Sequence, residues 1–160
     1  MSYIEIFVFD KEGNSESYAE VKNAWGGSMA IWNTLGEKYC GHGASIFDVS
    51  QMKEIWNLVD NTKVPMNERI VLFTTLDKVL VKKEDLPKVI DAFRDFGGND
   101  SLKEQADILE DIYNSCDEYI AVGWHQNSVS CEQWFDYNCL SGTEHFYLFD
   151  ELEGLDESNN

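Results

Sequence analysis

An amphipathic repeat at residues 100–114 constrains the fold of this chain more than any other stretch. Its apolar side chains follow the helical spacing i, i+4, i+7 and i+11, at Leu102, Ala106, Leu109 and Tyr113. One face of such a helix needs an apolar surface to pack against. The chain has 160 residues, of which 43% are hydrophobic and 13% aromatic, and this is enough to build that surface within one domain.

Several short apolar runs have the composition of strands rather than helices. Residues 3–9 (YIEIFVF) and 119–124 (YIAVGW) are rich in β-branched and aromatic side chains, which favour a pleated, half-buried surface. The run at 70–73 (IVLF) is short and continuously apolar, which is typical of a buried strand. The expected strands are 3–9, 70–73, 79–81, 119–124 and 145–149.

Helical spacing and end signals predict three more helices. One follows Gly27 and ends before Gly41, and a second has Ser50 as its expected N-cap. The third begins near Pro87, a residue type favoured in the first turn of a helix, and ends before Gly97. Strands and helices in this order predict an α+β fold, with a small, mostly antiparallel sheet of about four to five strands and four helices packed on it.

We expect a single domain over residues 1–152 and an acidic, disordered tail over 153–160. The N-terminus lacks the basic region of a signal peptide, and Glu5 interrupts its short apolar run. No apolar stretch in the sequence approaches membrane-spanning length. The expected location is therefore the cytoplasm, or the host cytoplasm for a phage-encoded protein, with reduced cysteines.

Acidic residues dominate the chain and increase toward its C-terminal end. The formal net charge is −18, from 30 acidic and 12 basic residues. Residues 1–80 contain 11 acidic and 7 basic residues, whereas residues 81–160 contain 19 and 5. From Glu104 to Asn160 there are 14 acidic residues and no lysine or arginine. Such a charge disfavours direct binding to nucleic acid or to an anionic membrane, and favours basic partners or metal cations.

Part of this charge has a regular order on the helix at 100–114. Four carboxylates lie there, at Asp100, Glu104, Asp107 and Asp111. They are offset by two positions from the apolar set, which places them about 200° around the helix. The four charges cover roughly 16 Å of axis, a density of about one per 4 Å, and one DNA strand carries a phosphate about every 3.4 Å. Like charges at i, i+4 destabilise a helix, so helix stability does not explain this stripe.

The charge pattern predicts a binding protein and not an enzyme. We expect an acidic inhibitor of phage or mobile-element origin, which imitates DNA and blocks a basic nucleic-acid-binding defence protein such as a CRISPR effector or a restriction nuclease. The tryptophans of its binding surface are expected to be partly exposed anchors. The expected binding residues are Asp100, Glu104, Asp107, Glu110, Asp111, Asp117, Glu118, Trp124 and Trp134.

Two other interpretations of the charge stay open. An immunity protein or antitoxin that neutralises a cationic toxin needs the same electrostatics. A merely solvated acidic face is equally compatible with the sequence.

A small hydrolase or metal-binding domain is a further alternative, and Asp10 is its first candidate residue. Asp10 follows an apolar strand, and this segment is similar to the haloacid dehalogenase signature, which uses an aspartate nucleophile. That signature needs a second aspartate and a threonine, where Glu12 and Asn14 stand here. We therefore interpret residues 10–14 as an ordinary turn.

Two other segments have chemically capable side chains. Cys40 and His42 are potential zinc ligands that Cys131, Cys139 or His145 would complete. Structural zinc sites usually contain two closely spaced pairs and only one is present, so buried, inert cysteines are favoured and no metal or cofactor is expected. The polar segment from His125 to Glu132 follows a predicted strand, as catalytic and recognition loops do.

Overall fold

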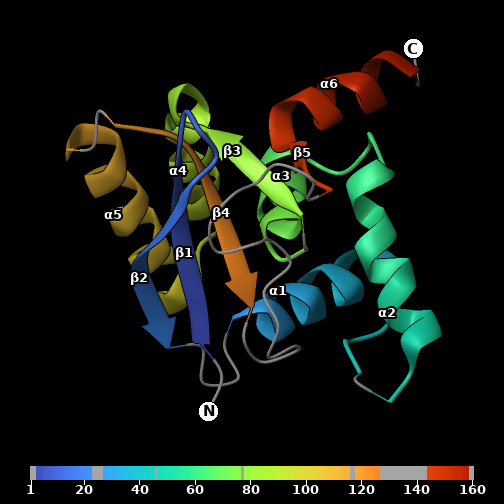
Figure 1. Ribbon diagram of the computed structural model, residues 1–160. Helices are drawn as coiled ribbons and strands as arrows, with labels where there is room; N and C mark the ends of the chain where they lie inside the picture. The colour runs from blue at the N-terminus through green and yellow to red at the C-terminus, as the bar shows by residue number, and fades with distance from the viewer. Residues whose placement is uncertain are drawn as a thin grey trace.

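A five-stranded sheet forms the centre of the computed structural model, which describes residues 3–22, 27–45, 47–76, 78–115, 118–126 and 144–158 (Figure 1). The strands are β1 (Tyr3–Asp10), β2 (Ser15–Lys22), β3 (Val79–Lys82), β4 (Tyr119–Gln126) and β5 (Phe146–Tyr147). Their order across the sheet is β2-β1-β4-β3-β5, and every pair is antiparallel except β3 with β5. The predicted α+β class with a mostly antiparallel sheet is confirmed.

β1 and β2 form a hairpin around a turn that the sequence predicted. The Asp10 carboxylate accepts hydrogen bonds from the backbone N–H groups of Glu12 and Asn14, both at 2.9 Å. Gly13 has a φ of 85°, which glycine adopts without strain. β2 itself was not predicted, because its sequence SESYAEVK is mostly polar. An edge strand tolerates this composition, since Val21 is its one buried residue.

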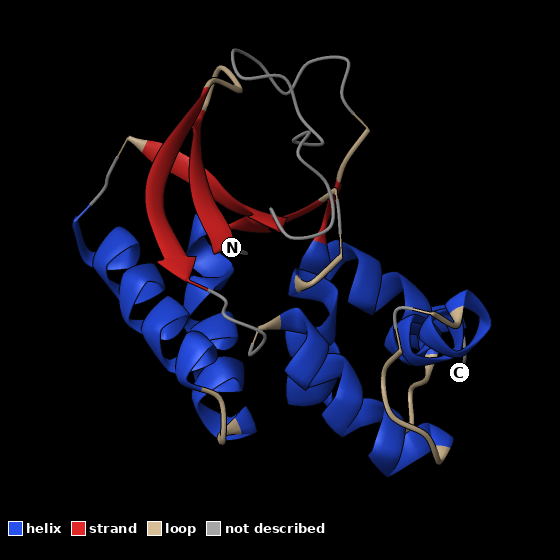
Figure 2. Ribbon diagram, turned by 90° about the horizontal axis from the view of Figure 1, so that it is seen from below, coloured by secondary structure: helices blue, strands red, loops and turns tan. Residues whose placement is uncertain are grey.

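The described part of the chain has six α-helices, which gather on one side of the sheet (Figure 2). They are α1 (Ser28–Leu35), α2 (Val49–Trp56), α3 (Met66–Thr74), α4 (Leu86–Phe96), α5 (Asp100–Ser115) and α6 (Leu148–Ser158). Buried side chains from all six helices form one apolar core with Ile4, Ile6 and Val8 of β1. The opposite face of the sheet holds a second buried cluster, formed by Phe7, Phe9, Leu80 and Ala121.

The predicted helix at 100–114 is α5, and most of its predicted inner face is confirmed. Leu102, Ala106 and Leu109 are each at most 1% exposed. Tyr113 is 43% exposed, and Ile112 takes the inward position instead. The predicted and observed inner faces therefore differ by one position at the C-terminal end of α5, where packing against the sheet and α4 buries Ile112. The predicted helix ending before Gly97 is also confirmed, as α4.

The run at 70–73 is helical, so the prediction of a strand there was wrong. It belongs to α3, which starts after Pro65 and is buried on every side from Glu68 to Thr74. A helix surrounded by the core has no polar face, and its sequence therefore lacks the period that separates a helix from a strand. The neighbouring prediction, 79–81, is confirmed as β3, which pairs with β4 and β5.

α1 continues directly into a π-helical turn, η1 (Gly36–Cys40). η1 ends at Gly41, whose left-handed φ of 77° reverses the backbone. The following loop returns beside η1, because the backbone N–H of His42 donates to the carbonyl oxygen of Gly36 at 3.3 Å. The prediction of a helix ending before Gly41 is confirmed, and its last turn is wider than an α-helix.

α2 begins earlier than predicted. Asp48 is its N-cap, and the Asp48 carboxylate accepts a hydrogen bond from the backbone N–H of Gln51 at 3.0 Å. The predicted cap, Ser50, lies inside the helix. Aspartate and serine cap helices about equally well, so the sequence alone does not choose between two positions so close together.

The C-terminal segment is more helical than predicted. The expected strand at 145–149 is only the two residues of β5, because Leu148 already belongs to α6. α6 extends to Ser158, so residues 153–158 are helical where a disordered tail was expected. Its apolar anchors are Leu148 and Leu152, both buried in the core at helical spacing. None of the helices that the structure describes is long and apolar enough to cross a membrane.

Candidate functional site

The acidic stripe predicted on α5 faces solvent. Its four carboxylates, at Asp100, Glu104, Asp107 and Asp111, are all exposed, while the opposite face of α5 contributes to the core. Asp100 stands in the first turn, where the helix dipole favours a negative charge. At a rise of about 1.5 Å per residue the stripe covers roughly 16 Å. The structure therefore places these four residues in one continuous row.

Arg94 of α4 neutralises part of the stripe. Its Nη2 lies 2.6 Å from Glu110 Oε2 and 3.2 Å from Asp107 Oδ1. Hydrogen bonds to Glu110 and then Asp107 raise the pKa of Arg94. Among the residues that the structure describes, no cation pairs with the other three carboxylates of the stripe, Asp100, Glu104 and Asp111. We call these three residues the open stripe.

Acidic side chains continue beyond the C-terminal end of α5. Glu118 is exposed in the turn before β4. Glu16 of β2 is also exposed, and its carboxylate accepts a hydrogen bond from the Tyr119 hydroxyl at 2.6 Å. Sequence reasoning missed Glu16 because β2 was not predicted. The predicted binding residues Asp117 and Trp134 lie outside the described residues.

Trp124 is a core residue, contrary to the prediction that it is a partly exposed anchor. It is 1% exposed, and its indole N–H donates to Gln105 Oε1 at 3.0 Å. The Gln105 amide in turn donates to the Ser101 hydroxyl at 3.1 Å. β4 has neighbouring strands on both sides and α5 below it, so this side chain is covered. Trp124 is therefore removed from the expected binding surface.

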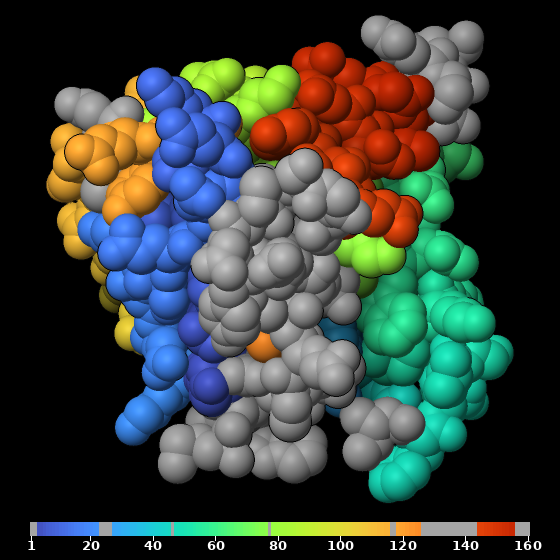
Figure 3. Space-filling model, viewed as in Figure 1, coloured from blue at the N-terminus to red at the C-terminus, as the bar shows by residue number. Residues whose placement is uncertain are grey.

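In the described part of the region without lysine or arginine, the acidic residues of α5 and of α6 lie on separate surfaces. α5 and α6 lie at opposite edges of the molecule in Figure 1, and Figure 3 shows β2 beside α5 and away from α6. α6 exposes Asp150, Glu151 and Glu153, and Lys82 of β3 lies 3.3 Å from Asp150 Oδ2. A partner with one flat binding surface therefore contacts either α5 or α6, but not both.

Asp10 and His125, the candidate catalytic residues of the hydrolase alternative, lie in a turn and in a buried strand. The Asp10 carboxylate holds the β1–β2 turn, and its hydrogen bonds, first from the backbone of Asn14, lower the pKa of Asp10. His125 belongs to β4 instead of a loop and is 4% exposed. The rest of the predicted loop, residues 127–132, lies outside the described residues.

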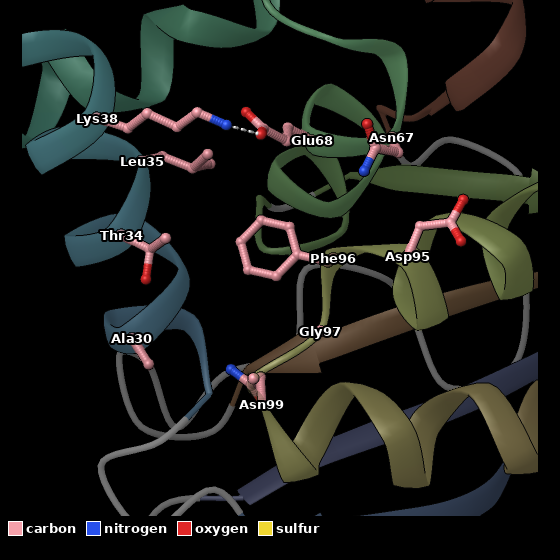
Figure 4. A pocket seen from close by; sticks show the side chains of 11 residues that line it. Ala30, Thr34, Leu35, Lys38, Asn67, Glu68, Asp95, Phe96, Gly97 and Asn99 are labelled. Atoms are coloured by element: carbon pink, nitrogen blue, oxygen red, sulfur yellow. Dashed lines mark hydrogen bonds and ion pairs between the residues drawn. The ribbon is translucent and has the colours of Figure 1, made fainter.

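A pocket of about 550 Å³ opens between α1, η1, α3 and the end of α4 (Figure 4). Lys38 of η1 points across it and forms an ion pair with Glu68 of α3, which raises the pKa of Lys38. Glu68 also accepts a hydrogen bond from the Tyr39 hydroxyl at 2.5 Å. Burial, and then Glu68, raises the pKa of Tyr39. These contacts hold η1 against α3.

Cys40 and His42 lie together, as their spacing predicted, and the third group beside them is Glu54 of α2. A ligand atom from each of the three side chains lies within 4.8 Å of the other two. The closest pair is His42 Nε2 and Glu54 Oε2, at 3.0 Å. The predicted additional ligand His145 is not in this cluster, and Cys131 and Cys139 lie outside the described residues. Glu54 was missed because it is on the next helix.

Comparison of the chain with protein-family models, with curated proteins and with solved structures finds no match. Among the described residues, two features are taken further below. One is the acidic row on α5, and the other is the cluster of Cys40, His42 and Glu54. They lie on opposite sides of the molecule, at α5 and α2 (Figure 1).

Proposed function

We propose that this protein binds a basic surface of another protein through α5 and thereby keeps nucleic acid away from that surface. The observation that supports this most is the open stripe. Asp100, Glu104 and Asp111 are exposed on one face of α5, and none is paired with a cation in the described part of the chain. Complementary charge accelerates association and selects the partner.

The partner class follows from the charge spacing. Neighbouring carboxylates of the row are about 5.5 Å apart along the helix axis, a spacing of the same order as the phosphate spacing of a DNA strand, about 3.4 Å. A protein that binds DNA already arranges lysine and arginine for such a row. The best candidates are therefore nucleic-acid-binding defence proteins, such as CRISPR effectors or restriction nucleases.

The packing of α5 supports binding without rearrangement. Leu102, Ala106 and Leu109 fix the helix in the core, and Arg94 of α4 holds its outer side through Asp107 and Glu110. A rigid row loses little conformational entropy when it binds, so more of the electrostatic attraction contributes to affinity.

The test measures DNA cleavage by purified restriction nucleases and CRISPR effectors with the protein added, at about 50 and 200 mM salt. The stripe variant D100K/E104K/D111K leaves both partners of Arg94 in place. The control variant E84K/E151K/E153K changes the net charge by the same amount on η3 (Lys83–Asp85) and α6. Both variants reverse one acidic residue in the first turn of an α-helix, so their effects on helix stability are matched.

We expect the unmodified protein to inhibit at least one of these enzymes, and more strongly at low salt. The stripe variant should need at least about tenfold more protein for the same inhibition, and the control variant should not. Inhibition that both variants lose equally would show that net charge acts alone. If no enzyme is inhibited, co-purification compares the basic proteins bound by the unmodified protein with those bound by the stripe variant. The absence of any basic partner that depends on α5 would contradict the proposal.

A further inference from the structure

Three side chains of different chemical types converge where η1 meets α2. Cys40 Sγ, a ring nitrogen of His42 and a carboxylate oxygen of Glu54 lie within 4.8 Å of one another. In a tetrahedral zinc site with bonds of about 2.0–2.3 Å, two ligand atoms are about 3.5 Å apart. The three atoms are therefore roughly 1 Å from ligand spacing, a distance that small side-chain rotations cover.

The backbone holds Cys40 and His42 close to each other. η1 is a π-helical turn. Such turns are rare in proteins, and those that occur are often at functional sites. The left-handed Gly41 reverses the chain so that His42 returns beside η1. A Cβ on Gly36 would lie 2.5 Å from the His42 carbonyl oxygen and 2.7 Å from Ile55 Cδ1. Glycine at this position is what lets η1, the loop and α2 approach so closely.

The ring of His42 is oriented as in a metal site. Nδ1 lies 3.2 Å from the carbonyl oxygen of Gly43, which only accepts hydrogen bonds, so Nδ1 carries the hydrogen. Nε2 lies 3.0 Å from the Glu54 carboxylate, which also only accepts, so Nε2 carries a hydrogen as well, and a zinc ion would bind Nε2 in place of that hydrogen. Metal-binding histidines usually donate one N–H to a carbonyl or carboxylate in this way. An ordinary histidine–glutamate ion pair explains the Glu54 contact but not the thiol beside it.

We propose that Cys40, His42 and Glu54 bind a zinc ion. A thiolate, an imidazole and a carboxylate are the three ligand types that zinc accepts in proteins. The side chain of Glu54 is 58% exposed and that of His42 21%, so one side of the cluster is open to solvent. A water molecule is therefore the expected fourth ligand, as in zinc sites with three protein ligands.

A zinc ion would replace hydrogens on two of the three ligands. A cysteine binds zinc as its thiolate, and a histidine nitrogen binds zinc in place of a hydrogen, so zinc binding should release protons. The site uses no residue of α5, so its presence or absence leaves the inhibitor proposal untouched.

Cobalt(II) provides the first test, because it replaces zinc and its spectrum identifies the ligands. The full chain, freed of metal and kept reduced, is titrated with Co²⁺ and then with Zn²⁺. We expect one Co²⁺ per chain, intense visible bands of a tetrahedral site and a thiolate-to-cobalt charge-transfer band. The charge-transfer band should disappear in C40S, and H42Q and E54Q should bind Zn²⁺ at least about tenfold more weakly.

H145Q is the matched control, because it removes an imidazole that lies outside the cluster, and it should keep the full spectrum. A wild-type chain without the charge-transfer band, or a band that survives in C40S, would overturn the proposal. A second measurement does not depend on any variant folding. Saturating Zn²⁺ should slow alkylation of Cys40 in the wild-type chain at least about tenfold by mass spectrometry, and an unchanged rate would also overturn it.

Discussion

Trp124 and Trp56 show how differently two tryptophans of one core are held. The indole N–H of Trp124 donates to Gln105 at 3.0 Å. The indole N–H of Trp56 is buried and has no hydrogen-bond partner among the residues described. Trp56 instead packs edge-on against Trp32, with ring centroids 5.5 Å apart. The hydrogen bond, more than the size of the ring, distinguishes the two sites.

Replacing each of these tryptophans by phenylalanine measures that hydrogen bond. W124F leaves the buried Gln105 carbonyl oxygen without its donor, and we expect a loss of about 1–3 kcal/mol in the free energy of unfolding. W56F also removes ring area but takes away a donor that had no partner, so its loss should be smaller. Urea unfolding followed by circular dichroism gives both values. An equal loss in the two variants would contradict the role assigned to Gln105.

At the scale of elements, two helical glycines have opposite surroundings. Gly36, where α1 meets η1, is buried and has a helical φ of −62°. A Cβ there would meet the backbone oxygen of His42 and the side chain of Ile55. Gly154, in α6, is exposed and has nothing within 4 Å of the place where a Cβ would stand. Helix propensity favours alanine at both positions, but packing opposes it at Gly36.

Alanine substitution should therefore have opposite effects at the two glycines. G36A forces η1 away from α2, and we expect a loss of about 1–3 kcal/mol in unfolding free energy. G154A should be neutral or add up to about 1 kcal/mol, because glycine is a poor helix former. Thermal unfolding of both variants checks the signs. A stable G36A would mean that the loop after η1 is not packed as described.

At the scale of the whole molecule, the charge acts against the compact state. The net charge is −18, and the acidic faces of α5 and α6 lie at opposite edges of the fold (Figure 1). Their separation limits the repulsion between them, but each face still repels its own neighbours. Arg94 of α4 pairs with carboxylates of α5, and Lys82 of β3 pairs with one of α6, but these pairs offset only part of the repulsion. Salt screens such repulsion between exposed groups.

The protein should therefore become more stable as salt increases. Between about 0.02 and 0.5 M NaCl we expect Tm to rise by roughly 2–4 °C, which corresponds to about 1 kcal/mol for a chain of this size. The control variant E84K/E151K/E153K carries less negative charge, and its Tm should rise less. Scanning calorimetry measures both. A Tm that does not change with salt would show that self-repulsion is unimportant in this fold.

Features that depend on neighbours along the chain could be predicted from the sequence. The 3.6-residue period of α5 predicted its buried and acidic faces. The end signals Pro87 and Gly97 predicted the extent of α4, and Asp10 with Gly13 predicted the turn that ends β1. These features rest on interactions within one helical turn or one tight turn, so a local pattern contains the whole physical cause.

Which segments are buried on all sides depends on how the whole chain packs. The run at 70–73 became a helix because α3 lies inside the core, where both a strand and a helix show an unbroken apolar sequence. Trp124 is buried because α5 crosses beneath β4, and Glu54 reaches Cys40 and His42 because α2 packs beside η1. These contacts join residues far apart along the chain, and no local spacing records them. Burial and side-chain convergence are properties of the assembled core, which exists only once the whole chain has folded.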